Sequence, residues 1–287
     1  SQRRRNSAKV GIPLALIPYL VIVGFFFLYP ISKVILRSFQ SNEGKFTFSN
    51  YATVMKFPYS QGLIGSIKIG LYTAIIAAII GSIIAYFIEA FGSAQTKKIL
   101  AALNGVIANT GGLPLAFMFI AAIGKSGAIT KILLFFGIDI YAGKFNLGTF
   151  NGVLLVYLYF QIPLMIIVFS PAISILRKEI RESAASLGAS TRQFWQRIGV
   201  PLLAPSFIGC FLLVFASGFS AYATANALTV GNVLLTPLQI AGLLNGNVSA
   251  SQLNLGKALA AVMILISAIA VIPYLLIQRR VAKWKKI

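Results

Sequence analysis

Apolar runs alternate with short polar segments along this chain. The long runs lie at about 12–36, 63–90, 99–123, 149–173, 201–226 and 256–278. Each approaches or exceeds the roughly 20 residues that a helix needs to cross the hydrocarbon core of a bilayer. Six crossings put both termini on one side. The pattern therefore predicts an all-α membrane protein with six transmembrane helices.

The segments between the runs have patterns of their own. Residues 37–61 are polar with interspersed aromatics, which predicts a short helix on the membrane surface. The apolar patches at 129–136 and 234–244 are too short to span, so we expect them to be interfacial or re-entrant.

The N-terminal residues 1–9 are basic, and the apolar run after them is longer than the core of a signal peptide. We therefore expect an uncleaved first helix with its N-terminus in the cytoplasm. The predicted organisation is a single transmembrane domain over 1–287. It has an N-terminal tail, first span and outer loop at 1–62, and a core at about 63–278.

The basic residues are unevenly distributed. The chain has 25 Lys and Arg against five acids, and 16 of the 25 lie in the N-terminal tail, at 97–98, in the stretch 176–205 and in the C-terminal tail. Eight others lie at the opposite side or its span edges. Cytoplasmic loops carry such an excess of Lys and Arg, so both termini are predicted to be cytoplasmic. Clusters between spans, without a basic stripe, argue against a nucleic-acid partner.

Composition restricts the chemistry. The chain of 287 residues is 58% hydrophobic and 10% charged, and it has one Cys and no His. A zinc or iron site needs several such ligands, and a Ser-His-Asp arrangement needs a His. We therefore expect no metal site and no catalytic residue. Cys210, inside an apolar run, is interpreted as a small buried hydrophobe.

Two charges lie near opposite ends of the second span, Lys68 and Glu89. A charge at the bilayer centre costs at least about 2.5–3.5 kcal/mol and much less near an interface. We favour interfacial anchors for both. The alternative is that Glu89 faces a pore or binds a cytoplasmic partner.

Polar and helix-breaking residues interrupt the third, fourth and fifth spans. They indicate either close helix packing or a water-filled solute path, since unpaired backbone is tolerated at membrane depth only in such places. The candidate path residues are Asn104, Asn109, Thr110, Gln161, Ser220, Tyr222 and Asn226.

No ATP-binding loop is expected. Gly124-Lys125-Ser126 resembles the end of a phosphate-binding loop, but Phe119 stands where that motif needs Gly. The chain is therefore expected to bind no nucleotide or other cofactor itself.

The stretch 176–205 is a polar, basic interruption. Its pattern predicts an amphipathic helix that ends at Gly188, because glycine accepts the positive φ of a helix end. A second helix is expected from Ser190, with Gln193 completing a capping box. Pro201 is expected to open the fifth span. As a bare pattern, this is also compatible with an ordinary interfacial loop.

The spacing in this stretch is more specific. Gly188 lies six residues after Glu182, and Pro201 lies thirteen after Gly188. The full set resembles the EAA signature of ABC importer permeases, with Ser183 where that family usually has Ala: Glu182, Ser183, Ala184, Gly188, Ala189, Ile198 and Pro201. The six spans, with the motif between the fourth and fifth, also resemble that family, most closely its polyamine, ferric-iron and aminoethylphosphonate group.

The resemblance implies a mechanism. The motif helix would dock on a separate ATPase subunit that uses ATP and Mg, and two such subunits would rock two permeases between inward- and outward-facing states. It implies a second permease subunit, a heterodimer being favoured over a homodimer, and an extracytoplasmic solute-binding protein. It also implies a place in a bacterial cytoplasmic membrane. A secondary transporter or channel driven by an ion gradient is the alternative.

Overall fold

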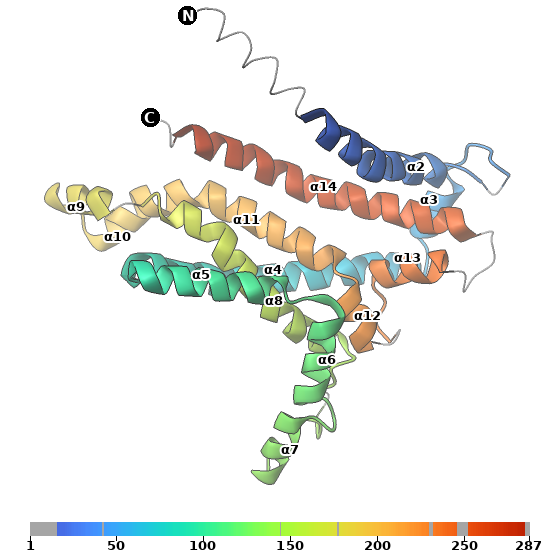
Figure 1. The fold of residues 1–287 in the computed structure, drawn as a ribbon, viewed down its shortest axis with the longest axis horizontal. Coiled ribbons are helices and arrows are strands. Elements are labelled where there is room, and N and C mark those ends of the chain that lie inside the picture. Colours follow the sequence, from blue (N-terminus) through green and yellow to red (C-terminus); the bar gives the residue numbers. More distant parts are fainter. Residues whose placement is uncertain are drawn as a thin grey trace, which may run out of the picture. The chain divides into compact units, whose positions relative to one another are not determined.

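A computed structural model describes residues 16–41, 43–143, 145–176, 178–229, 232–245 and 252–284. The basic tail at 1–9 lies outside these ranges. The described chain is helical (Figure 1), and its one isolated β-bridge joins Gln40 and Phe46. Six of its helices are long and apolar enough to cross a membrane: Leu16–Ser38, Tyr59–Phe91, Gly112–Phe135, Phe150–Ile173, Thr191–Ser220 and Leu253–Leu276. The predicted all-α class with six spans is confirmed.

The chain divides into two compact units. One comprises Ser1–Phe57 and Ile240–Val262, and the other comprises Pro58–Gln239 and Met263–Ile287. The last helix, α14 (Leu253–Trp284), contributes to both. The prediction of one domain over 1–287 stays a prediction.

The first unit contains the first span and its outer loop. The span has a π-helical turn, η1 (Gly24–Leu28), before α2 (Tyr29–Ser38), and a short helix α3 (Ser49–Val54) follows. The Asn50 amide donates hydrogen bonds to the carbonyls of Ser38 and Gln40, which holds α3 against the end of α2. The short helix predicted within 37–61 is therefore present.

The second unit is built on α4 (Tyr59–Phe91), α8 (Phe150–Ile173) and α11 (Val200–Ser220). These helices pack against one another, and α5 (Ala94–Asn109) packs against α8. The helix bounds of α4 and α8 agree closely with the predicted second and fourth spans. The packing is possible because α4 presents small residues to its neighbours.

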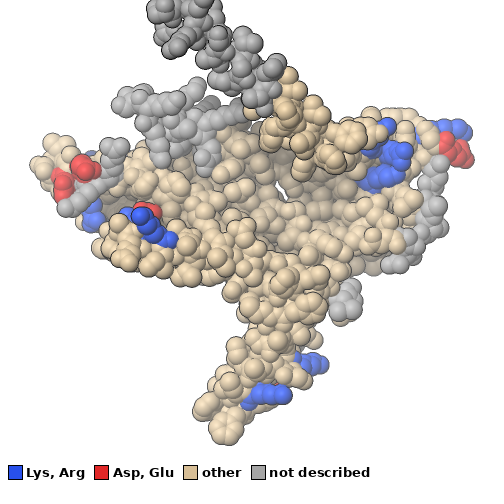
Figure 2. All heavy atoms as spheres, in the orientation of Figure 1, with Lys and Arg blue, Asp and Glu red and all other residues tan. Residues whose placement is uncertain are grey.

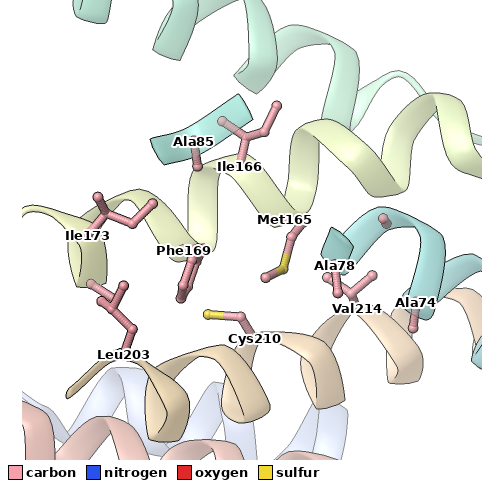
Figure 3. Close-up of a cluster of buried hydrophobic side chains, with 12 residues drawn as sticks. Ala74, Ala78, Ala85, Met165, Ile166, Phe169, Ile173, Leu203, Cys210 and Val214 are labelled. Atoms are coloured by element: carbon pink, nitrogen blue, oxygen red, sulfur yellow. The ribbon is translucent and has the colours of Figure 1, made fainter. Parts of the chain in front are cut away.

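Figure 3 shows this core, where Ala74 and Ala78 of α4 lie near Met165 of α8 and Val214 of α11. A Cβ built on Gly81 would lie 2.8 Å from the Cβ of Met165, so α4 and α8 approach too closely for a larger residue there. Without a hydrophobic drive between helices in lipid, close backbone approach and dispersion hold such interfaces together. Cys210 is buried in this core, as its apolar run predicts.

The bounds predicted for the third span, 99–123, were wrong, because the helical segment long enough to span is Gly112–Phe135. The interruption expected at its polar residues Asn109 and Thr110 is present. The helix α5 ends at Asn109, and α6 (Gly112–Ile123) turns away from it (Figure 1). The side chains of Asn109 and Thr110 each donate a hydrogen bond to the backbone carbonyl four residues earlier. Gly112 has φ +76°. These local bonds end α5, because they satisfy carbonyls that a continued helix would use.

Beyond α6, the chain forms α7 (Ala128–Phe135), which corresponds to the short apolar patch predicted at 129–136. The hydroxyl of Tyr141 donates to the Ile123 carbonyl at 2.8 Å and ties the following loop to the end of α6. Burial raises the pKa of Tyr141 above its ordinary value.

The fifth span was also wrongly bounded at both ends. Its helix begins at Thr191 and runs through α10 (Thr191–Phe194) and a π-helical turn, η2 (Trp195–Gly199), into α11. It ends at Ser220, short of the predicted 226, and α12 (Ala223–Thr229) and α13 (Thr236–Leu244) follow. The second apolar patch, predicted at 234–244, is thus a short helix.

Pro201 does not open the span, and it sits two residues beyond the π-helical turn. The N–H of Val200 bonds to the carbonyl of Trp195, five residues back. Tyr29 bonds to Gly24 in the same way, directly before Pro30. Proline lacks an N–H and its ring displaces the turn before it, so the wider turn keeps the neighbouring N–H paired.

Candidate functional site

The loop at 176–205 forms the predicted helix, glycine turn and second helix. The first helix is α9 (Lys178–Ser186), and Gly188 follows it with φ +77°. The Gly188 N–H donates to Ala185 at 2.9 Å, and the Ala189 N–H donates to Ala184 at 3.0 Å. This pair of bonds is the Schellman ending of a helix, which a residue with a Cβ enters at a cost.

The second helix starts with the predicted capping box. The Ser190 hydroxyl accepts a hydrogen bond from the Gln193 N–H at 3.3 Å, and the Gln193 side chain accepts one from the Ser190 N–H at 2.8 Å. The capping box at Ser190 begins only two residues after the glycine that ends the first helix, Gly188. Local chemistry therefore sets the sharp turn between the two helices.

The predicted motif residues fall into two groups. Glu182, Ser183 and Gly188 are exposed, while Ala184 is buried. Ile198 and Pro201 lie on the next helix, in η2 and at the start of α11. The side chain of Leu187, which was not among the predicted coupling residues, is 88% exposed beside the glycine turn. An apolar side chain at a helix tip was the signal for it.

A cavity of about 600 Å³ lies next to α9. Its lining includes Glu89 and Lys97, whose side chains form a salt bridge of 2.9 Å, and Lys97 also donates to the Glu89 carbonyl at 2.8 Å. Figure 2 shows acidic and basic side chains side by side in this part of the molecule. Glu89 therefore has an ionic partner in its own chain. Lys68, the other charge of this span, is exposed on α4.

The breaks in the third and fifth spans meet. The Thr224 hydroxyl accepts a hydrogen bond from the Gly112 N–H at 2.9 Å and donates one to the Gly112 carbonyl at 3.2 Å. The Tyr157 hydroxyl donates to the Ala221 carbonyl at 2.7 Å, in the gap between α11 and α12. Tyr157 was missed from the sequence, although a buried tyrosine hydroxyl usually needs a partner.

Gln161 is fully buried between α4, α8 and α11. Its Nε2 donates to the Val214 carbonyl at 3.0 Å, and its Oε1 has no hydrogen-bond partner among the described residues. A Cβ on Gly218 would lie 2.5 Å from this amide nitrogen and 2.8 Å from the hydroxyl oxygen of Thr73. The glycine makes room for both polar side chains.

The other candidate path residues differ in exposure. Asn109 and Ser220 are exposed and bond to carbonyls of their own helices, as does the half-buried Thr110. Tyr222 and Asn226 are exposed around the gap that follows α11, and Asn104 is half-buried on α5. The structure gathers residues 109–112 and 221–226 at one junction and leaves Gln161 apart from it. The residues searched contain no group of three His, Cys, Asp or Glu that could hold a metal.

Residues 99–287 match the family described as "Binding-protein-dependent transport system inner membrane component". The chain belongs to this family. It is a multi-pass protein of the inner membrane and a permease subunit of a binding-protein-dependent ABC importer, and such a subunit is not catalytic.

Named relatives are distant. The chain is 28% identical over 237 residues to the trehalose transport permease SugB of Mycobacterium tuberculosis, covering 82% of this chain and 78% of SugB. It is 27% identical to the spermidine/putrescine permease PotB of Haemophilus influenzae, with 74% and 75% covered. It is 28% identical to a probable sulfate permease, cysT, of Helicosporidium sp. subsp. Simulium jonesii, spanning only 61% of that protein.

Solved structures share the fold. A chain from a bacterial ABC transporter that imports the acidic polysaccharide alginate matches with a TM-score of 0.68 over 99% of both chains, at 13% identity. The same kind of transporter in complex with an alginate pentasaccharide-bound periplasmic protein matches with a TM-score of 0.65 over 96% of this chain and 93% of the other. This agrees with the fold class predicted from the sequence.

Proposed function

We propose that this chain forms half of the translocation path of an ATP-driven importer and that the 176–205 loop couples it to a separate ATPase subunit. One observation carries the proposal. A helix that ends in a glycine turn exposes Glu182, Ser183 and Leu187 together. Such a tip offers a carboxylate and an apolar side chain to a partner.

The turn itself suits force transmission. The Schellman bonds and the capping box fix the angle between α9 and α10 over a few residues, and the helix from Thr191 continues without a break to Ser220. A push on α9 would therefore be carried along a continuous helix into the membrane. Ala184, Ala189, Ile198 and Pro201 would support this element without contacting the partner directly.

The partners follow from this role. We propose two ATPase subunits that use ATP and Mg, a second permease, favoured as a homologous chain over an identical copy, and an extracytoplasmic solute-binding protein. Both termini and the 176–205 loop would then face the cytoplasm. The chain itself would bind no cofactor.

The path would be lined by neutral polar groups at the junction of the broken helices. Asn109, Thr110, Ser220, Tyr222 and Asn226 lie in or beside this junction, and Asn104 and Gln161 lie deeper in the bundle. We propose a small polar solute of the polyamine, phosphonate or ferric-iron class. The relatives named above carry solutes as different as spermidine and trehalose, so the solute is best measured on the cognate binding protein.

The coupling role is tested by charge changes at the loop tip. Gly188→Asp and Glu182→Lys are expected to abolish ATP-dependent uptake in proteoliposomes of the complete importer while the chain still inserts at normal levels. Glu179→Lys, an exposed position on the same helix outside the motif, serves as the matched control and should transport normally.

Two results would overturn the assignment. Wild-type uptake by both motif variants would show that the loop tip does not couple. Uptake driven by an ion gradient, without any co-purifying ATPase subunit, would indicate a secondary transporter.

A further inference from the structure

Two cavities adjoin at the end of the bundle that carries α9. The first, of about 600 Å³, is the charged cavity described above. The second, of about 490 Å³, lies between α4, α8 and the helix that contains η2 and α11. Tyr86, Ile173 and Trp195 line both. The two hollows are therefore neighbours with a shared wall.

The second cavity is almost entirely apolar. Besides the shared wall, its lining consists of Ser82, Ile83, Phe87, Phe169, Val200, Leu203, Ala204 and Phe207. Figure 3 shows Phe169 pointing from α8 toward α11, on the side where Leu203 lies. Its walls belong to helices that are long and apolar enough to cross a membrane. Hydrocarbon suits such a space, because water would find almost no hydrogen-bond partner there.

The first cavity is amphipathic. Its lining contains two acids, Glu89 and Glu182, and two bases, Lys97 and Arg181. The four charges sum to zero, and Glu89 and Lys97 pair with each other at 2.9 Å. A ligand that carries both signs can exchange contacts with such groups without leaving a net charge in the cavity.

The wall between the cavities carries an aromatic pair. The rings of Tyr86 and Trp195 meet edge to face with centroids 5.2 Å apart. Tyr and Trp are enriched where a membrane protein crosses from hydrocarbon to headgroups. An apolar space on one side of this pair and a charged space on the other match the two ends of a lipid.

We propose that the two cavities form one binding site for a phospholipid with a zwitterionic headgroup of the phosphatidylethanolamine class. One acyl chain would fill the apolar cavity. The phosphate would lie toward Arg181 and Lys97, and the ammonium toward Glu182 and Glu89. If the 176–205 loop faces the cytoplasm, as the proposed function requires, this lipid belongs to the cytoplasmic leaflet. The site itself does not depend on that orientation.

This lipid would lie directly behind the loop proposed to couple. Arg181 and Glu182 belong to α9, and Trp195 belongs to the continuous helix that follows. A bound lipid would therefore support α9 from the membrane side.

Lipid retention tests the site. The purified full-length chain is washed in detergent, incubated with vesicles of phosphatidylethanolamine, phosphatidylcholine or phosphatidylglycerol, washed again and analysed for bound lipid by mass spectrometry. Ala204→Phe fills the apolar cavity and is expected to weaken retention about tenfold. Arg181→Gln should weaken it several-fold. Ala121→Phe, an exposed position on α6 away from both cavities, is the matched control and should retain lipid like the wild type.

The wild type is expected to retain phosphatidylethanolamine best. The choline headgroup cannot donate hydrogen bonds from its ammonium, and the phosphatidylglycerol headgroup carries only negative charge. Equal retention by Ala204→Phe and Ala121→Phe would overturn the site. Preference for phosphatidylglycerol would overturn the assignment of the headgroup. The measurement needs no ATP, solute or partner, so failure of the transport assay leaves it interpretable.

Discussion

The side chain of Thr224 bonds to both the N–H and the carbonyl of Gly112, at 2.9 and 3.2 Å. The two residues are 112 positions apart, and each lies beside a break in a membrane helix. One hydroxyl thus pairs with the Gly112 N–H, which the break between α5 and α6 leaves without a helical partner, and with the carbonyl of the same residue. It joins α6 to α12.

Loss of this hydroxyl should destabilise the junction. Thr224→Val keeps the shape of the side chain but leaves the Gly112 N–H unpaired at a partly buried position. We expect a loss of about 1–2 kcal/mol in the free energy of unfolding, measured on the purified chain in mixed micelles. Thr53→Val, which removes only a bond within α3, should be nearly neutral. Equal effects of the two changes would contradict a special role for the junction.

Gly218 and Gln161 should be coupled. In Gly218→Ala, the new methyl group would overlap the Gln161 amide, and we expect lower thermal stability by about 1–3 kcal/mol. Shortening the partner in the double variant Gly218→Ala/Gln161→Ala should recover part of that loss. Destabilisation that is simply additive in the double-mutant cycle would show that the two side chains do not press on each other.

Two helical glycines should respond oppositely to alanine. A Cβ on Gly81 would press on Met165 of α8, so Gly81→Ala should lower stability and loosen α4 from α8. Gly105 on α5 has open space around it, and Gly105→Ala should raise stability by about 0.5–1 kcal/mol through the better helix propensity of alanine. Thermal unfolding of the two variants side by side checks the sign of each effect.

The pair Glu89 and Lys97 permits a charge-swap experiment. If the main role of Glu89 is its salt bridge with Lys97, Glu89→Lys alone should impair insertion or stability. Adding Lys97→Glu should then restore much of the lost insertion or stability. If Glu89 instead contacts another subunit, the swap will fold normally and still fail to transport. Expression level and ATP-dependent uptake, measured together, separate these outcomes.

The local pattern was sufficient for much of this fold. Hydropathy alone located α4 and α8, because a long apolar helix with few charges is stable only across a bilayer. The turn at Gly188 and the cap at Ser190 were also predictable, since their hydrogen bonds join residues no more than five apart. The spacing from Glu182 to Pro201 indicated the family for the same reason: it is a short-range signature.

Tertiary structure decided how the broken apolar runs meet. Polar residues inside the run at 99–123 indicate a break, but nothing in its periodicity shows that Gly112 finds Thr224 far along the chain. The arrangement of neighbouring helices likewise decides which residue pairs with Glu89, whether Gln161 is buried and where the two adjoining cavities form. The hydropathy pattern of a sequence shows whether each residue prefers water or lipid. The packing of distant helices decides which polar groups meet, because a hydrogen bond requires a partner within about 3 Å.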